Sequence, residues 1–283
     1  MRFDTHIHLD VMSDEAIDTA LFAAPDYRAF IPGCDPNDVA KALARFASDS
    51  RIALGTAIHP WELGTRAEEG GWLHPQDDPR WPLLLAQAND PRIVAIGECG
   101  LDLFRHTDEA MRARAEAYFV AQIGVALAVH KPLVLHCVRA HARCAELLRL
   151  HRADRVGGIV HAFAGSAEEA AAYRRLGFTV SIGAAVTREA SRRVRAVAAA
   201  LPDDSFVIET DAPYMRAGEG PAWSGSVDHI EAVAATVATL RGTTAEAIFA
   251  MTAARGMHHL GAASLPLQSN LGNDRAAPHT EPS

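Results

Sequence analysis

Lysine is almost missing from this chain, since Lys41 and Lys131 are its only two, and arginine supplies the remaining basic side chains. The formal net charge of −8 leaves no excess of positive charge. A protein that coats long nucleic acids by charge alone carries a basic face, so this class is excluded. An enzyme whose bound divalent cations supply positive charge locally is still compatible with an acidic chain.

Cysteine is also scarce, with four residues and no CxxC spacing, and a chain of 283 residues needs no disulfides for stability. The longest mostly apolar stretch, residues 118–129, contains Gln122 and is too short to span a bilayer. The first predicted strand begins almost at Met1, which predicts that no cleavable signal sequence precedes it. We therefore expect a cytoplasmic protein without a membrane partner, and no feature of the sequence indicates a protein partner.

Apolar residues make up 49% of the chain, which is enough for a full core. Strand-like and helix-like stretches alternate, and each predicted strand precedes a helix or a long loop with a helix. This pattern predicts an α/β fold of the (β/α)8 TIM-barrel type. The expected strands span residues 3–9, 27–31, 51–58, 93–97, 132–137, 158–163, 178–182 and 205–210. The expected helices span residues 13–24, 35–47, 82–88, 108–129, 140–150, 166–176, 187–200, 227–240 and 244–260.

One domain is expected over residues 1–260, because no internal repeat or linker divides the chain. Residues 61–80 are rich in glycine, proline and charge, which predicts a long loop over one rim of the domain. Residues 261–283 contain few apolar side chains and three prolines, which predicts a disordered C-terminal tail.

The first predicted strand alternates polar and apolar residues, which places Asp4, His6 and His8 on one face. Two imidazoles at positions i and i+2 stand about 7 Å apart and can converge on one metal ion. A pair of structural histidines on a half-buried strand is the alternative, because HxH alone is a weak motif.

Further metal-binding side chains occur where other predicted strands end, and in a TIM barrel these ends lie together. Because so many metal-binding side chains are unlikely to gather by chance at one end of a sheet, they predict an active site. One ion with an open position normally takes three protein ligands, so this set indicates two divalent ions, with Glu98 as the bridge. Mixed imidazole and carboxylate ligation favours Zn or Mn over Mg. The residues are His6, His8, His59, Glu98, His136, His161 and Asp211.

Five motifs together resemble the TatD-type metal-dependent deoxyribonucleases, in the order that this family shows. They are DTHIHLD at residues 4–10, AIHP at 57–60, IGECGLD at 96–102, HAFAGS at 161–166 and ETDAPY at 209–214. The resemblance implies a barrel of the metal-dependent hydrolase superfamily that hydrolyses DNA phosphodiester bonds, with DNA ends or short oligonucleotides as substrate. It also implies one metal on His6, His8, Glu98 and Asp211, and a second on Glu98, His136 and His161.

In this interpretation Glu98 and Asp211 are the catalytic residues, and Asp211 accepts a proton from the attacking water. Glu209 lies two residues before Asp211 and is expected to orient a ligand or a water. The family often carries arginine where this chain has Val138, so the phosphate contacts must come from elsewhere. We expect substrate contacts from His59, Arg139, Arg188 and Arg216, with solvated surface arginines as the alternative.

Two other functions are compatible with the motifs. A hydrolase of the amidohydrolase or phosphotriesterase-lactonase type also begins with HxH and ends with an aspartate on the eighth strand. Many of those enzymes bridge their metals with a carboxylated lysine on the fourth strand, and residues 94–97 contain no lysine. A metalloprotein that has lost turnover is the second alternative, although a decayed site usually loses ligands first.

Overall fold

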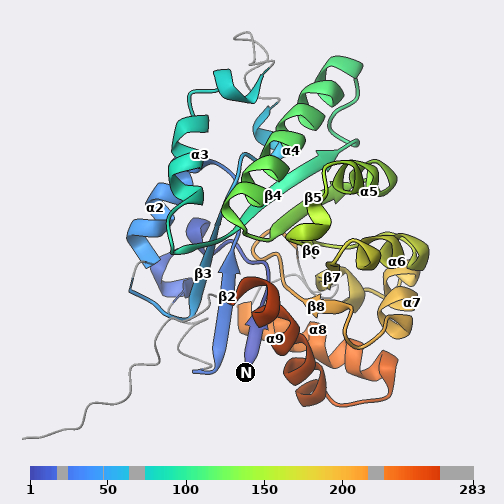
Figure 1. Cartoon of the computed structure of the whole chain (residues 1–283). Coiled ribbons are helices and arrows are strands. Elements are labelled where there is room, and N and C mark those ends of the chain that lie inside the picture. The colour runs from blue at the N-terminus through green and yellow to red at the C-terminus, as the bar shows by residue number, and fades with distance from the viewer. Residues whose placement is uncertain (18–24, 47, 64–73, 216–225, 262–283) are drawn as a thin grey trace, which may run out of the picture.

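Eight parallel strands form one sheet in the order of the sequence, so each strand pairs with the next (Figure 1). This computed structural model describes residues 1–17, 25–46, 48–63, 74–215 and 226–261. Thr5 closes the barrel, because its backbone N–H donates to the carbonyl oxygen of Ile208 at 3.3 Å. The strands are β1 (Arg2–Asp4), β2 (Tyr27–Ile31), β3 (Ile52–Thr56), β4 (Ile93–Asp102), β5 (Leu133–Val138), β6 (Gly158–Val160), β7 (Phe178–Ile182) and β8 (Phe206–Ile208).

Helices surround the strands, and several begin where their sequences supply a cap. Ser166 and Glu169 form a capping box, in which each side chain accepts from the other residue's backbone N–H. The helices are α2 (Pro36–Phe46), α3 (Trp81–Ala88), α4 (Glu109–Val129), α5 (His141–Leu150), α6 (Ala167–Arg175), α7 (Arg192–Ala200), α8 (Ser226–Arg241) and α9 (Ala245–Leu260). Short 3-10 turns are η1 (Leu9–Val11), η2 (Pro60–Leu63), η4 (Pro75–Asp77), η5 (Ala153–Arg155) and η6 (Ala184–Thr187).

The fold class predicted from the sequence is confirmed, but several strand boundaries were wrong, and two of these errors affect the site. The first strand ends at Asp4 rather than residue 9, because the Asp4 carboxylate accepts the His6 backbone N–H at 3.3 Å and turns the chain. The fourth strand continues to Asp102, because a register irregularity between Ile96 and Cys99 lets it go on pairing with β5. Several other strands also end earlier than expected.

The helix expected over residues 187–200 was wrong at its start. The Thr187 hydroxyl donates to the carbonyl oxygen of Ala184 at 2.7 Å, so it closes η6 and does not cap a helix. Helix α7 begins only at Arg192. The expected helix over residues 13–24 is present at 14–17, and the rest of it lies outside the described residues. Residues 64–73 of the expected loop and the expected tail from 262 onward also lie outside them.

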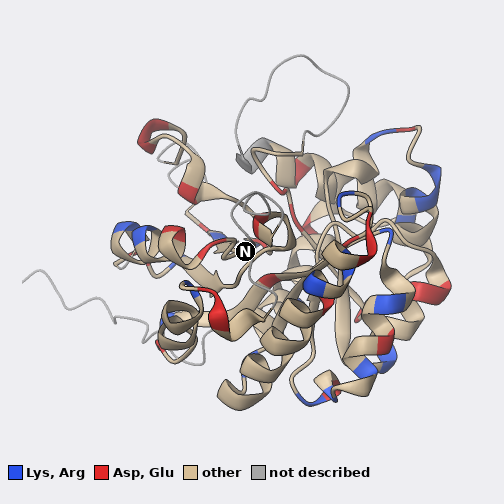
Figure 2. Cartoon of the chain, turned by 90° about the horizontal axis from the view of Figure 1, so that it is seen from above, with Lys and Arg blue, Asp and Glu red and all other residues tan. Residues whose placement is uncertain are grey.

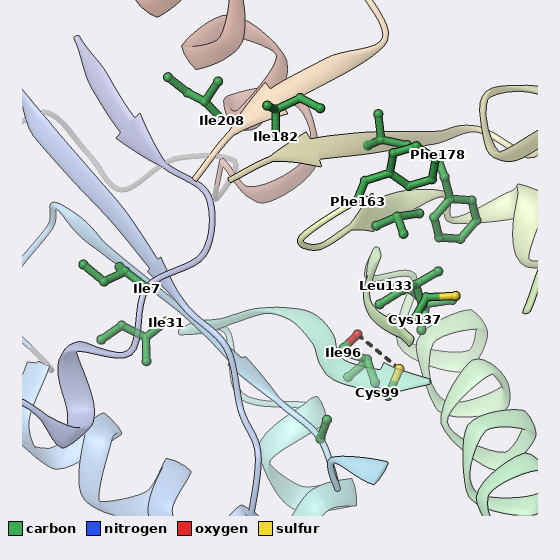
Figure 3. Packing of buried hydrophobic residues seen from close by; sticks show 14 of the residues in the cluster. Ile7, Ile31, Ile96, Cys99, Leu133, Cys137, Phe163, Phe178, Ile182 and Ile208 are labelled. Carbon is green, nitrogen blue, oxygen red and sulfur yellow. Dashed lines mark hydrogen bonds between the residues drawn. The ribbon is translucent and has the colours of Figure 1, made fainter. Parts of the chain in front are cut away.

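Two apolar layers hold the barrel together. The larger layer lies between strands and helices, and Figure 3 shows Ile96, Cys99 and Cys137 among its members. The Cys99 Sγ lies 4.0 Å from the carbonyl oxygen of Ile96. The smaller layer contains one buried side chain from each of six strands and two from α9: Phe3, Phe30, Ala95, Val134, Ile159, Val207, Ala253 and Leu260.

Helix α9 packs against β1 and β8 and closes the N-terminal end of the barrel (Figure 1). Gly256 permits this contact, because a Cβ there would lie 2.7 Å from the Phe3 ring. The Thr179 hydroxyl and Nε2 of His259 form a hydrogen bond of 2.8 Å at the same end. In the part of the chain that the structure describes, no helix combines the length and the apolar character needed to cross a membrane.

Candidate active site

His6 and His8 lie just after the end of β1. Backbone hydrogen bonds hold this segment to the residues that follow β8 and to β2. His6 accepts the backbone N–H of Asp211 at 2.9 Å, and His8 donates its own to Ala212 at 2.8 Å. Between them, the backbone N–H of Ile7 bonds to Phe30 of β2. His6 is fully buried and His8 nearly so, which puts both imidazoles inside the C-terminal end of the barrel.

Glu98 occupies the centre of this end and is surrounded by imidazoles. Its Oε1 lies 2.6 Å from Nδ1 of His136 and 3.2 Å from Nε2 of His59. Its Oε2 lies 3.1 Å from Nε2 of His6. The two carboxylate oxygens therefore face different histidines. Burial would raise the pKa of Glu98, but the surrounding imidazoles hold that pKa well below its usual value.

Asp211 follows β8 and completes the ring of ligand atoms. Its Oδ1 lies 3.4 Å from Nε2 of His8, and its Oδ2 lies 3.8 Å from Nε2 of His161. Burial raises the pKa of Asp211, yet these imidazoles lower it below the ordinary value overall. Asp211 is therefore a carboxylate at neutral pH and can both bind a cation and accept a proton.

Two further carboxylates fix the orientation of two of the histidines. Glu209 Oε1 lies 2.9 Å from Nδ1 of His161 and also accepts the backbone N–H of Ala162 at 2.7 Å. Asp102 Oδ2 lies 3.1 Å from Nε2 of His136. In each case the second ring nitrogen faces Glu98, an arrangement that orients histidine ligands in metal sites. The carboxylates overcome the desolvation of both rings and raise the pKa of His136 to about 9 and of His161 to about 10.

No role had been given to Asp102 from the sequence, although one signal was available. Glu98 and Asp102 stand four residues apart on one strand, so alternation places both carboxylates on the same face. That reasoning was blocked because the strand was expected to end at residue 97. The register irregularity that extends β4 has no local signature in the sequence.

Three overlapping groups of side chains bring potential ligand atoms close enough for metal ions. Within each group, these atoms lie within 4.8 Å of one another. Both ring nitrogens of His6 are buried without a hydrogen bond in the described residues, so this imidazole has a nitrogen available to a metal ion. The donor set therefore fits divalent cations. The groups are His6, His161 and Asp211; His6, His8 and Glu98; and His59, Glu98 and His136.

The structure thus gathers all six residues expected as metal ligands, and it adds His59, which had been expected to contact the substrate. Burial lowers the pKa of His59 to about 4, which keeps its ring neutral and able to bind a metal. Arg139, another expected substrate contact, lies with its guanidinium 4.8 Å from the centre of the Phe104 ring. Arg188 follows η6 and was wrongly expected in the first turn of α7, and Arg216 lies outside the described residues.

A sequence profile of a family described as TatD related DNase matches residues 3–255. An uncharacterized metal-dependent hydrolase of Bacillus subtilis, YabD, is 30% identical over 89% of this chain and 96% of its own. The 3'-5' ssDNA/RNA exonuclease TatD of Edwardsiella piscicida is 37% identical, over 50% of this chain and 56% of its own length. The crystal structure of YjjV, a TatD homologue of Escherichia coli, superposes with a TM-score of 0.79 at 25% identity, covering 92% of this chain and 98% of its own.

Proposed function

The chain belongs to the TatD-related DNase family of metal-dependent hydrolases, and we propose that it cleaves phosphodiester bonds at DNA ends or in short oligonucleotides. The observation that carries this proposal is the position of Glu98, whose two oxygens face different histidines. A carboxylate in this position can bridge two cations, and paired cations suit phosphodiester hydrolysis. The relative named as an exonuclease supports a nucleic-acid substrate.

We propose that one divalent cation binds to His6, His8, Glu98 and Asp211, and that a second binds to Glu98, His136 and His161. His59 lies close enough to Glu98 and His136 to be a further donor of the second group. The mixed imidazole and carboxylate ligands favour Zn or Mn over Mg. When bound, the cations would supply a polarised water and positive charge for the phosphate oxygens.

The protein's own groups have separate tasks in this proposal. Asp211 is kept ionised by the neighbouring imidazoles and accepts the proton of the attacking water. Glu209 and Asp102 hold the rings of His161 and His136 so that one nitrogen of each faces Glu98. Arg139 contributes a phosphate contact from the end of β5, and Arg188 and Arg216 remain proposed contacts on the sequence argument alone.

The test is an assay of the purified protein on end-labelled single-stranded DNA, a lactone and a dipeptide, with and without a chelator. We expect a ladder of shortened DNA that chelation abolishes and that added Mn or Zn restores. Hydrolysis of the lactone or dipeptide without any DNA cleavage would contradict the proposal and favour the amidohydrolase-type alternative. Metal analysis of the same preparation should give up to two ions per chain.

A further inference from the structure

Two large aromatic side chains are exposed beside the metal-ligand candidates. Trp61 retains 41% of its surface in solvent and Phe104 retains 60%. The Trp61 ring centre is 5.1 Å from that of His59 and 5.5 Å from that of His136. Exposed aromatic rings next to an active site mark a binding surface more often than single exposed apolar residues elsewhere.

One carboxylate ties these aromatic residues to the site. Asp102 Oδ2, which faces His136, also accepts the indole N–H of Trp61 at 2.7 Å. Its Oδ1 accepts the backbone N–H groups of Phe104 and Arg105 at 2.9 and 3.0 Å. The Trp61 ring and the backbone at Phe104 are therefore held in place relative to the ligands, although both side chains are open to solvent.

An arginine lies over each ring. The guanidinium carbon of Arg105 is 3.9 Å from the Trp61 ring centre, and that of Arg139 is 4.8 Å from the Phe104 ring centre. In the described part of the chain, neither guanidinium forms an ion pair with a carboxylate. Two cations without an acidic partner, in a chain of net charge −8, are available to an anionic ligand.

Acidic residues gather elsewhere at the site. A cavity of about 150 Å³ borders His8, and Asp10, Asp38 and Glu62 are among the residues that line it. Figure 2 shows acidic and basic residues interspersed over the outer helices, without one uniformly basic face among the described residues. A phosphate chain that reaches the ligands is therefore favoured over the arginine side and disfavoured over the acidic side.

We infer that Trp61, Phe104, Arg105 and Arg139, called here the aromatic–arginine platform, stack unpaired bases of a single-stranded nucleic acid next to the cleaved bond. This inference rests on the proposed function. Bases stack on exposed aromatic rings whatever their sequence, and arginine adds cation–π attraction and contacts to phosphate. A base within a duplex already has both faces covered, so the platform selects single strands.

The experiment measures KM and kcat for a single-stranded oligonucleotide and for the same strand with abasic sites beside the cleaved bond. On the normal strand, Phe104→Ala should raise KM by roughly 5- to 100-fold, the range expected from losing one base stack, with kcat nearly unchanged. Phe104→Tyr, which keeps an aromatic ring, should restore KM. Leu150→Ala is the matched control, since Leu150 is 62% exposed at the last residue of α5 and should affect neither constant.

On the abasic strand, the wild-type KM should already be raised, and Phe104→Ala should add nothing. An equal effect of Phe104→Ala on both strands, or no effect on either, would overturn the platform while leaving the nuclease proposal intact. No cleavage of any oligonucleotide by the wild type would overturn both. Arg139→Ala should lower the slope of log KM against log salt concentration by about the contribution of one phosphate contact. An unchanged slope would remove Arg139 from the platform.

Discussion

The two halves of the barrel interior are built from the same strand faces but differ in chemistry. Val134 and Ile159 lie two residues before His136 and His161, and Val207 lies two residues before Glu209. The lower half, at the N-terminal end of the barrel, is the smaller apolar layer, and α9 closes it. The upper half, at the C-terminal end, contains the imidazoles and carboxylates of the candidate site. One step of strand alternation thus separates the part of the barrel that stabilises the fold from the part that contains the metal-ligand candidates.

Histidines desolvated to different degrees in the two halves show what the carboxylates contribute. Burial lowers the pKa of His259, at the closed end, to about 4. The same desolvation acts on His136 and His161, but carboxylates beside them raise their pKa values to about 9 and about 10. The upper half is thus organised to hold positive charge, and a metal ion can take the place of the protons, because metal binding releases protons from its ligands.

Glu98→Ala should give the largest effect, with loss of detectable activity together with loss of bound metal, because Glu98 belongs to two of the three ligand groups. Metal analysis and the oligonucleotide assay measure the two outcomes. Cys99→Ala is the control, since its sulfur packs in the outer layer and its removal should leave metal content unchanged. Near-normal turnover with two metals in Glu98→Ala would contradict the bridging role.

Asp211→Asn should lower kcat by roughly 10²- to 10⁴-fold and retain at least one metal, because an amide cannot accept the water's proton. Steady-state kinetics and metal analysis test this. Asp10→Asn serves as the control, because Asp10 lies 4.0 Å from His8 but belongs to none of the three ligand groups. If kcat of Asp211→Asn stayed at the wild-type value, Asp211 would have no part in the mechanism.

Ile159→Ala addresses the lower half directly, two residues from His161. Removing this fully buried side chain should cost about 2–5 kcal/mol in free energy of unfolding, by the usual loss of packing and creation of a cavity. Urea denaturation measures the change. The folded variant should keep its metal content and KM. Loss of metal in a folded Ile159→Ala protein would show that the two halves are not separable.

His259→Gln should reduce the dependence of stability on pH. The folded pKa of about 4 lies below the ordinary 6.5, so the unfolded chain binds the proton first. The contribution of neutral His259 is therefore complete above pH 6.5 and is lost as the pH falls toward 4. Between pH 8 and pH 5, the wild type should lose about 1–2 kcal/mol more stability than His259→Gln. The exposed neighbour provides the control His258→Gln, and equal pH profiles for wild type and His259→Gln would contradict the prediction.

Truncation after Gly261 should have the smallest effect, with melting temperature and activity essentially unchanged. The prediction rests on the composition of residues 262–283, which lie outside the described part of the chain. Gly261 is retained because its N–H donates to the Met257 carbonyl at the end of α9. A clear drop in melting temperature in thermal unfolding would indicate that the tail takes part in closing the lower half.

The sequence was sufficient for the fold class and for most of the residues that meet at the site. Strand and helix periodicity predicted eight strands, each followed by a helix or a long loop with a helix, and the ends of parallel strands meet in any such barrel. His6, Glu98, His136, His161 and Asp211 could therefore be placed together before any distance was known. Their assignment to two cations remains a prediction.

The tertiary structure decided what depends on register and on contacts between distant strands. Asp4 turns the chain after β1, and an irregularity extends β4 to Asp102, which then reaches His136 and Trp61. Local alternation cannot show either event, because it describes one strand at a time. Register and barrel closure set the distances between strands, so they decided that His59 joins Glu98 and that Arg139 lies over Phe104.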